Sequence, residues 1–172
     1  MIKFRKKGLD AFRRVWFLNL ICLLLAGCST MNGGLDPEKA LIPRFVFEEL
    51  SNEGYANLAI LPISDVRIPV KNEASISEYD ILDVSAVDTE YGKCLQFNLT
   101  PAASRDFYRE SVSNQGRRLV LLVNGKAMGV RRVDGANDSG TIYIFAEIAE
   151  EDLVEYAKEM KGTILEIRKR LD

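Results

Sequence analysis

The stretch GKCLQFNLTPAASRDF, residues 92–107, decides the fold because it joins a strand signal directly to a helix start. Apolar and polar side chains alternate over 93–99, which is the period of a strand with one buried face. Thr100 and Pro101 follow as a hydroxyl N-cap and a proline at the first helical position. The stretch therefore predicts a strand that ends where a helix over 100–114 begins.

The remaining elements follow from similar signals in both directions along the chain. Asn124-Gly125 is typical of a two-residue β-hairpin turn, and it joins two apolar runs. Alternation, turn residues and helix caps predict a helix at 150–161 that Gly162 ends, and strands at 44–50, 55–63, 66–70, 84–89, 93–99, 119–123, 128–133, 141–146 and 163–167. The first two of these strands are expected to pair as an N-terminal β-hairpin. The sequence thus predicts an α+β fold, a mostly antiparallel sheet with two helices packed on one face, preceded by that hairpin.

Two of the predicted strands are apolar on both faces, although the helices of a two-layer fold cover only one face of the sheet. The side chains on the second face are Val120, Leu122, Tyr143 and Phe145. Either the N-terminal hairpin packs over them, or they form an exposed apolar surface that binds a partner or an extended peptide. These four residues are the candidate partner-binding site. Cys94 is expected on the same face, packed under the hairpin.

The N-terminus has three parts of different composition. Six basic residues lie within 1–14, an apolar run follows at 15–25, and the small residues Ala26 and Gly27 precede Cys28. The apolar run is too short for a helix that must cross ~30 Å of hydrocarbon, which takes about 20 residues. The segment resembles a lipobox, which implies a diacylglyceryl group on the thiol of Cys28 and cleavage just before that residue.

This resemblance implies a protein that is anchored to the membrane of the cell envelope by lipid on Cys28. Ser29 follows where an aspartate would mark inner-membrane retention in enteric bacteria, so the expected location is the outer membrane, facing the periplasm. The expected organisation is a signal peptide at 1–27, a tether at 28–43, an N-terminal β-hairpin segment at 44–70 and an α+β domain at 71–172.

Composition excludes several classes of function. Without residues 1–27 the chain holds 17 basic and 24 acidic residues, a net charge of −7. An acidic domain gains nothing from nucleic-acid phosphates, so we expect no nucleic-acid partner. The chain has no histidine, which removes the commonest general base and the commonest metal ligand. We therefore expect no catalytic residue, no metal and no cofactor, and a binding role rather than an enzyme.

Other patterns leave alternatives open. An envelope hydrolase acting on glycan or peptide would need paired carboxylates, and the candidates are Asp80, Asp83, Asp88 and Glu90. The oxygen-rich loop at 134–140 could bind Ca²⁺, although its spacing does not match an EF-hand. The arginine pairs at 117–118 and 131–132 adjoin across their predicted hairpin and could form a basic spot. A last alternative is a structural spacer within an envelope complex.

Four segments follow one another in a recognisable order: GKCLQFNLTPAASRDF (92–107), NQGRRLVLLVNGKAMG (114–129), the glycine before a strand at 140–142, and EEDLVEYAKEM (150–160). The order of these signals over 79–160 resembles the periplasmic head of the first large domain of SecD and SecDF, membrane subunits that assist protein export. The chain departs from the family after the turn, where a small residue followed by Ala-Pro is usual and this chain has Gly129-Val130-Arg131. No transmembrane helix follows in the sequence.

The resemblance implies a SecD-head-like domain over 71–172 and a role in handling polypeptide or binding a partner rather than in transport. The leading hypothesis is therefore a non-catalytic, lipid-anchored protein that faces the periplasm and binds protein or peptide partners.

Overall fold

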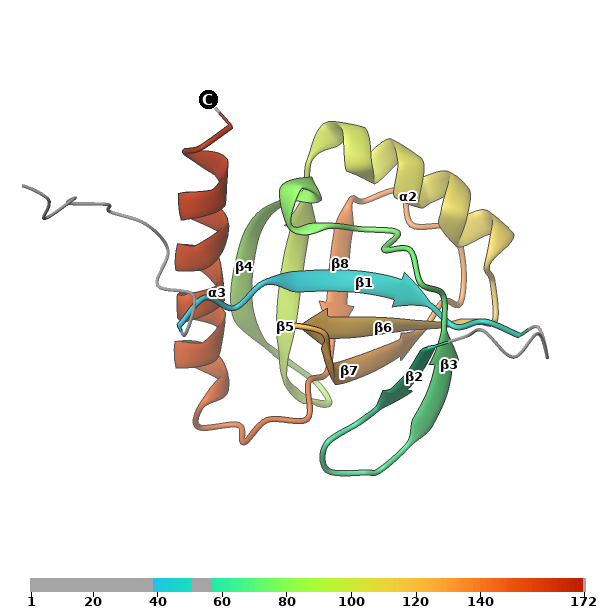
Figure 1. Ribbon diagram of the computed structural model, residues 1–172, viewed down its shortest axis with the longest axis horizontal. Coiled ribbons are helices and arrows are strands. Elements are labelled where there is room, and N and C mark those ends of the chain that lie inside the picture. The colour runs from blue at the N-terminus through green and yellow to red at the C-terminus, as the bar shows by residue number, and fades with distance from the viewer. Residues whose placement is uncertain (1–38, 51–56, 172) are drawn as a thin grey trace, which may run out of the picture. The chain divides into compact units, whose positions relative to one another are not determined.

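The computed structural model describes residues 39–50 and 57–171, so the lipobox at Cys28 and the predicted turn at 51–54 lie outside the described residues. Figure 1 shows a 3₁₀ turn, η1 (Glu78–Asp80), the helices α2 (Pro101–Ser113) and α3 (Leu153–Arg168), and the strands β1 (Pro43–Phe47), β2 (Asn57–Ile60), β3 (Arg67–Val70), β4 (Ile81–Thr89), β5 (Gly92–Leu99), β6 (Arg118–Val123), β7 (Lys126–Arg132) and β8 (Thr141–Ile144). Within the described residues, no helix combines the length and the apolar character needed to cross a membrane.

Two antiparallel sheets, in the orders β1-β6-β7 and β4-β5-β8, form the body of the domain. An isolated bridge joins Gly129 of β7 to Ala146, in the segment that follows β8. Next to it, the N–H of Glu147 donates to the carbonyl of Met128 at 2.6 Å. The two sheets are thus joined at this end of β7, and the structure records no further strand pairing between β7 and β8 among the described residues.

One hydrophobic core lies between the two sheets and the two helices. Phe45 of β1 meets Phe97 of β5 edge to face, with ring centroids 4.9 Å apart. Helix α2 adds Phe107 to this core, and α3 adds Met160 and Ile164. Figure 1 shows α3 alongside β4 and α2 across the end of the core. The predicted α+β class, with two helices packed against a mostly antiparallel sheet system, is confirmed.

The signals that bound the central elements act as the sequence predicts. The Thr100 hydroxyl accepts a hydrogen bond from the N–H of Ala103 at 3.2 Å, which caps α2. Asn124 and Gly125 both have positive φ, 51° and 77°, as a type I′ hairpin turn requires. These two local features fix where β5 ends and how β6 returns as β7.

The predicted pairing of the N-terminal hairpin is wrong. Strand β1 pairs along its whole length with β6, from Pro43 opposite Val123 to Phe47 opposite Leu119. Strand β2 pairs instead with β3, in a hairpin that branches from the body in Figure 1. The physical reason is that Phe45 and Phe47 bury their rings in the main core, which a hairpin lying outside the sheet could not provide.

Two ion pairs hold β1 to its surroundings. The Arg44 guanidinium donates to both carboxylate oxygens of Glu78, at 2.7 and 2.9 Å. Near the other end of the strand, Glu48 accepts from the side chain and the backbone N–H of Arg118. Both carboxylates are largely buried, and their arginines hold the pKa values of both below the usual range, mainly through these hydrogen bonds.

The predicted end of the last helix is also wrong, as is the strand expected at 163–167. Helix α3 continues through Gly162 to Arg168. Thr163, Ile164 and Ile167 are buried, so the helical face formed by Leu153 and Met160 extends for two further turns. A mid-helix glycine costs about 1 kcal/mol relative to alanine, and each of the buried aliphatic side chains that follow contributes roughly 1.5–3 kcal/mol. Burial of this face therefore overrides the glycine.

Candidate functional site

The structure divides the four predicted partner-binding residues between two different surfaces. Val120 of β6 is fully buried, and Leu122 is partly buried beside it. A second hydrophobic cluster covers them from the β2–β3 side, through Ala59, Leu61, Ile68 and Val70, together with Val46 and Ala127. Val120 therefore offers no surface to a partner, because an apolar cover of the kind expected lies over it. That cover is the β2–β3 hairpin rather than a hairpin of 44–63.

Tyr143 and Phe145 lie on a face that the hairpin does not cover. Tyr143 pairs with Gln96 of β5, and Gln96 pairs in turn with Ser85 of β4, so these side chains share the face opposite the core. The side chains of Tyr143 and Phe145 are 44% and 45% exposed, respectively. Two large aromatic residues thus stand half in solvent on the outer face of the β4–β5–β8 sheet.

Cys94 belongs to this outer face but is itself fully buried. It pairs with Val87 of β4, and the register of β5 with β8 places it next to Phe145. Burial raises the pKa of its thiol, and the nearby Arg131 partly opposes that effect. The prediction that Cys94 packs on the second face is correct. The prediction that it lies under an N-terminal hairpin is wrong, because the β2–β3 hairpin covers β6 and β7 instead.

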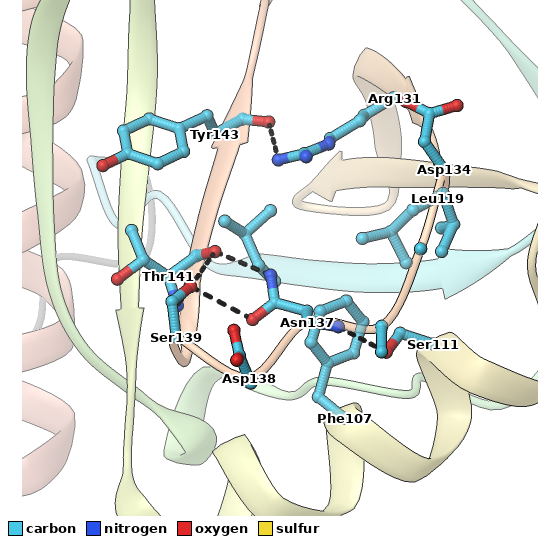
Figure 2. A pocket seen from close by; sticks show the side chains of 14 residues that line it. Phe107, Ser111, Leu119, Arg131, Asp134, Asn137, Asp138, Ser139, Thr141 and Tyr143 are labelled. Atoms are coloured by element: carbon cyan, nitrogen blue, oxygen red, sulfur yellow. Dashed lines mark hydrogen bonds between the residues drawn. The ribbon is translucent and has the colours of Figure 1, made fainter.

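A cavity of about 260 Å³ opens between β7 and β8, beside the exposed aromatic residues. Figure 2 shows the side chains of Phe107, Leu119 and Arg131 around it, and the carbonyl oxygen of Tyr143 facing Arg131. Its inner wall is apolar and continuous with the core, since Phe107, Leu119 and Ile142 belong to the core cluster. Its rim is polar and includes Arg131 and the loop 134–139. The cavity lies where the described residues of β7 and β8 form no ladder, since β7 bridges only to Ala146, just after β8.

Asn137 holds the loop that forms one side of this cavity. Its backbone N–H donates to the hydroxyl of Ser111 at 2.8 Å, which ties the loop to α2. Its side-chain amide donates to the carbonyl of Thr141 at 2.8 Å and accepts from the N–H of Gly140 at 3.1 Å. Figure 2 shows the bonds of Asn137 to Ser111 and Thr141. Asn137 thereby fixes the loop against α2 through its backbone N–H and against β8 through its side-chain amide.

Arg131 closes the other side of the cavity. Its guanidinium donates from Nη1 to the carbonyl oxygen of Tyr143 at 3.3 Å, across the gap between β7 and β8 (Figure 2). Paired strands lie about 4.8 Å apart and bond directly through their backbones. A long side chain that bridges two backbones instead shows that β7 and β8 are too far apart here for direct pairing.

Three of the four carboxylates considered for hydrolysis have partners other than one another. Asp80 accepts from the N–H and hydroxyl of Ser77, and so serves as a cap of η1. Asp83 pairs with Lys161 at 2.7 Å and Asp88 with Lys93 at 2.8 Å. Five residues of strand separate Asp83 from Asp88, which at ~3.3 Å per residue is about 17 Å, far beyond the ~5–9.5 Å that glycoside hydrolysis uses. Glu90 stands in the exposed turn that follows β4.

The other two polar patterns have partners within the protein. Within residues 39–50 and 57–171, no group of three or more acidic, cysteine or histidine side chains is placed to hold a metal ion. In the loop at 134–140, the side-chain oxygen of Asn137 already accepts a backbone N–H. Arg118 does pair with Arg132 across the β6–β7 hairpin, but each has an acidic neighbour, Glu48 and Asp134 respectively. The basic spot is therefore divided among separate acceptors.

Sequence reasoning found the aromatic pair and missed the cavity beside it. Its inner wall joins α2, β6 and β8, and only the tertiary arrangement brings these together. One local signal was available. Gly129 begins the segment after the turn where this chain departs from the small residue and Ala-Pro that are usual in SecD and SecDF. A Cβ at Gly129 would lie 2.5 Å from the carbonyl oxygen of Phe145. This close approach is where the two sheets join and where the cleft begins.

Comparison with known proteins supports the fold. No protein-family model matches the chain, and no curated protein sequence matches it. Among solved structures, it is similar to SecDF in its Super-membrane-facing form, with a TM-score of 0.56 and 16% identity over 71% of this chain and 19% of that chain. It is also similar to a structure of SecDF, a membrane component that enhances protein export, with a TM-score of 0.55 and 15% identity over 74% of this chain and 63% of that chain.

The chain thus spans about a fifth of one of these relatives and under two thirds of the other. At these identities the similarity shows a shared fold, which is the SecD-like fold that the order of sequence signals indicated.

Proposed function

We propose that this chain is a lipid-anchored protein of the cell envelope, facing the periplasm from the outer membrane, whose domain binds protein or peptide partners without catalysing a reaction. The observation that carries the proposal is the outer face of the β4–β5–β8 sheet. There Tyr143 and Phe145 are about half exposed beside an open cavity. Aromatic side chains are enriched at protein interfaces, where burying them contributes large contact area.

Two further observations support the proposal. The basic, apolar and small-residue segments before Cys28 are those of a lipoprotein signal. The domain shares its fold with SecDF, which is described as a membrane component that enhances protein export. A role in contact with other polypeptides is in keeping with that fold. Of the four candidate residues, Tyr143 and Phe145 carry the binding proposal, whereas Val120 and Leu122 pack in the cluster under the β2–β3 hairpin.

Site-specific photocrosslinking in cells tests the binding proposal. A photoreactive amino acid replaces Tyr143 or Phe145, and in a matched control it replaces Tyr91, which is 86% exposed in the β4–β5 turn. We expect the same protein to be crosslinked from positions 143 and 145 and not from 91. Equal crosslinking from all three positions, or none from the first two, overturns the proposal.

Mass spectrometry tests the anchor separately. The mature protein isolated from membranes is expected to begin at Cys28 and to carry lipid on that residue. In a Cys28→Ala variant, we expect the uncleaved chain and no lipid. An unmodified Cys28 in the wild-type protein removes the anchor and the location that depends on it.

A further inference from the structure

Among residues 39–50 and 57–171, strand β8 has one edge with no paired strand over 141–143. The N–H of Leu99 donates to the carbonyl of Gly140, and the register then places Ile142 and Ile144 in the pairs that bond to β5. Because bonding directions alternate along a strand, Thr141 and Tyr143 point their N–H and C=O groups away from β5. That direction is toward the gap between β8 and β7.

Side chains occupy the positions that the donors of a missing strand would take. The amide of Asn137 donates to the carbonyl of Thr141 at 2.8 Å. The guanidinium of Arg131 donates to the carbonyl of Tyr143 at 3.3 Å, two residues further along the same edge. Carbonyls two residues apart are the acceptors that the N–H groups of an added antiparallel or parallel strand would reach. The edge is therefore closed by side-chain bonds that an extended chain could replace.

The cavity behind this edge fits an apolar side chain. Its inner wall is formed by Phe107, Leu119 and Ile142, and its volume is about 260 Å³. An added strand on β8 would direct alternate side chains inward, so one of them would enter the cavity. The side chains on either side of it would face solvent, next to Tyr143.

The charges at the rim favour a basic segment. Among the residues that line the cavity, Asp134 and Asp138 are acidic and Arg131 is basic. These three side chains give the lining a net charge of −1, and Asp134 also lies 3.9 Å from the guanidinium of Arg132. Lysine or arginine beside the buried apolar residue would then be attracted, and acidic residues would be repelled.

We propose that the gap between β7 and β8 takes up an extended polypeptide segment as an added strand on β8. One apolar side chain of the segment fills the cavity, basic residues flank it, and Arg131 leaves the carbonyl of Tyr143. The proposal rests on the proposed function, since it names the site and the kind of partner through which binding occurs. The Arg131 side chain competes with the incoming strand for the carbonyl oxygen of Tyr143.

The test uses the full chain in detergent and defined peptide probes followed by NMR. The main probe is acetyl-Thr-Lys-Thr-Ile-Thr-Lys-Thr-amide. One control replaces both lysines by glutamate, and another carries N-methyl groups on the residues beside isoleucine, which removes main-chain donors. We expect the main probe to slow hydrogen exchange of the Tyr143 amide and to bind at least roughly tenfold more tightly than either control.

Two variants separate strand addition from contact with the aromatic face. Arg131→Ala removes the hydrogen bond from the guanidinium to the carbonyl of Tyr143. We expect this variant to bind the main probe about threefold to tenfold more tightly, as loss of one competing hydrogen bond implies. Tyr143→Pro blocks the edge and is expected to lose binding, whereas Tyr143→Ala keeps the backbone N–H and most of the binding. Should Tyr143→Pro fail to fold, the Arg131 variant and the exchange of the Tyr143 amide decide.

The outcomes distinguish this inference from the proposed function. Unchanged exchange at Tyr143 with every peptide, or equal binding by the N-methylated probe, overturns strand addition. If crosslinking from positions 143 and 145 still captures one protein in cells, the proposed function stands and binding occurs through the aromatic face alone. If the main probe protects Tyr143 but nothing is crosslinked in cells, the edge is competent and the proposed envelope role fails.

Discussion

Replacing Gly129 by alanine should weaken the joint between the two sheets. An added Cβ at Gly129 would lie 2.5 Å from the carbonyl oxygen of Phe145 and 3.2 Å from the Cα of Ala146. Real Cβ atoms essentially never come within 3.0 Å of such atoms, so the two backbones must separate by at least about half an ångström. Both atoms in the way belong to the backbone, and rotating a side chain cannot relieve the clash.

The expected cost combines two terms. Forcing an extra carbon into a packed site costs about 1–3 kcal/mol. Opening the joint also strains the adjacent hydrogen bond from Glu147 to Met128, and losing such a bond costs ~0.5–1.5 kcal/mol. We therefore expect a loss of about 2–4 kcal/mol in the free energy of unfolding, or roughly 10 °C in Tm for a domain of this size.

Urea unfolding of the full chain, followed by circular dichroism, measures this loss. The matched control is Gly162→Ala, the same chemical change at a glycine whose added Cβ meets no atom within 4 Å. A Gly129→Ala protein as stable as wild type would refute the close contact between β7 and the segment after β8. It would also remove the explanation given for the start of the cleft.

Three other predictions concern stability and reactivity. Gly162→Ala should raise the free energy of unfolding by about 0.5–1 kcal/mol, because alanine suits the interior of α3 better than glycine. A lower free energy of unfolding would indicate instead that the helix ends at this position. Unfolding in urea should become easier as the pH falls, because the pKa values of Glu48 and Glu78 are lowered by their arginines. The two ionised carboxylates contribute fully to the free energy of unfolding above their unfolded pKa of about 4.3, and this contribution is lost as the pH falls through their pKa values in the folded protein. A free energy of unfolding that does not change between pH 5 and 3 would contradict this. Cys94 should resist alkylation at pH 8 in the folded protein and react once urea unfolds it, as peptide mass mapping can follow, because burial raises its thiol pKa; rapid labelling of the native state would show that the outer face is open there.

The sequence predicted the elements with strong local signals. The Thr100-Pro101 cap and the Asn124-Gly125 turn each require one backbone geometry, and the structure has both. Alternation in β5 also assigned Leu95 and Phe97 to the core correctly. In these cases the information lies within a few neighbouring residues, so tertiary contacts only confirm it.

The errors arose where partners distant in the chain decide the outcome. Strand β1 could pair with the next strand or with β6, and only the space for Phe45 and Phe47 in the core selects β6. Gly162 is a valid helix stop in isolation, and only the burial of Ile164 and Ile167 carries α3 past it.

The candidate site shows the same division. The sequence pattern identified two strands that are apolar on both faces. The structure shows that the second faces of these strands have different surroundings. Val120 lies under the β2–β3 hairpin, whereas Tyr143 and Phe145 remain half exposed. The cavity could not be predicted, because its walls come from α2, β6, β7 and β8.

Hydroxyl-radical footprinting of Tyr143 and Phe145 tests the central claim most directly, namely that the open aromatic face of the β4–β5–β8 sheet is a binding surface. Oxidation of these two residues is compared between the purified protein and the protein in intact cells, with Tyr91 as the internal reference. The account predicts ready oxidation of all three residues in the purified protein, and protection of Tyr143 and Phe145 but not Tyr91 in cells. Equal oxidation of the aromatic pair in both settings would contradict it.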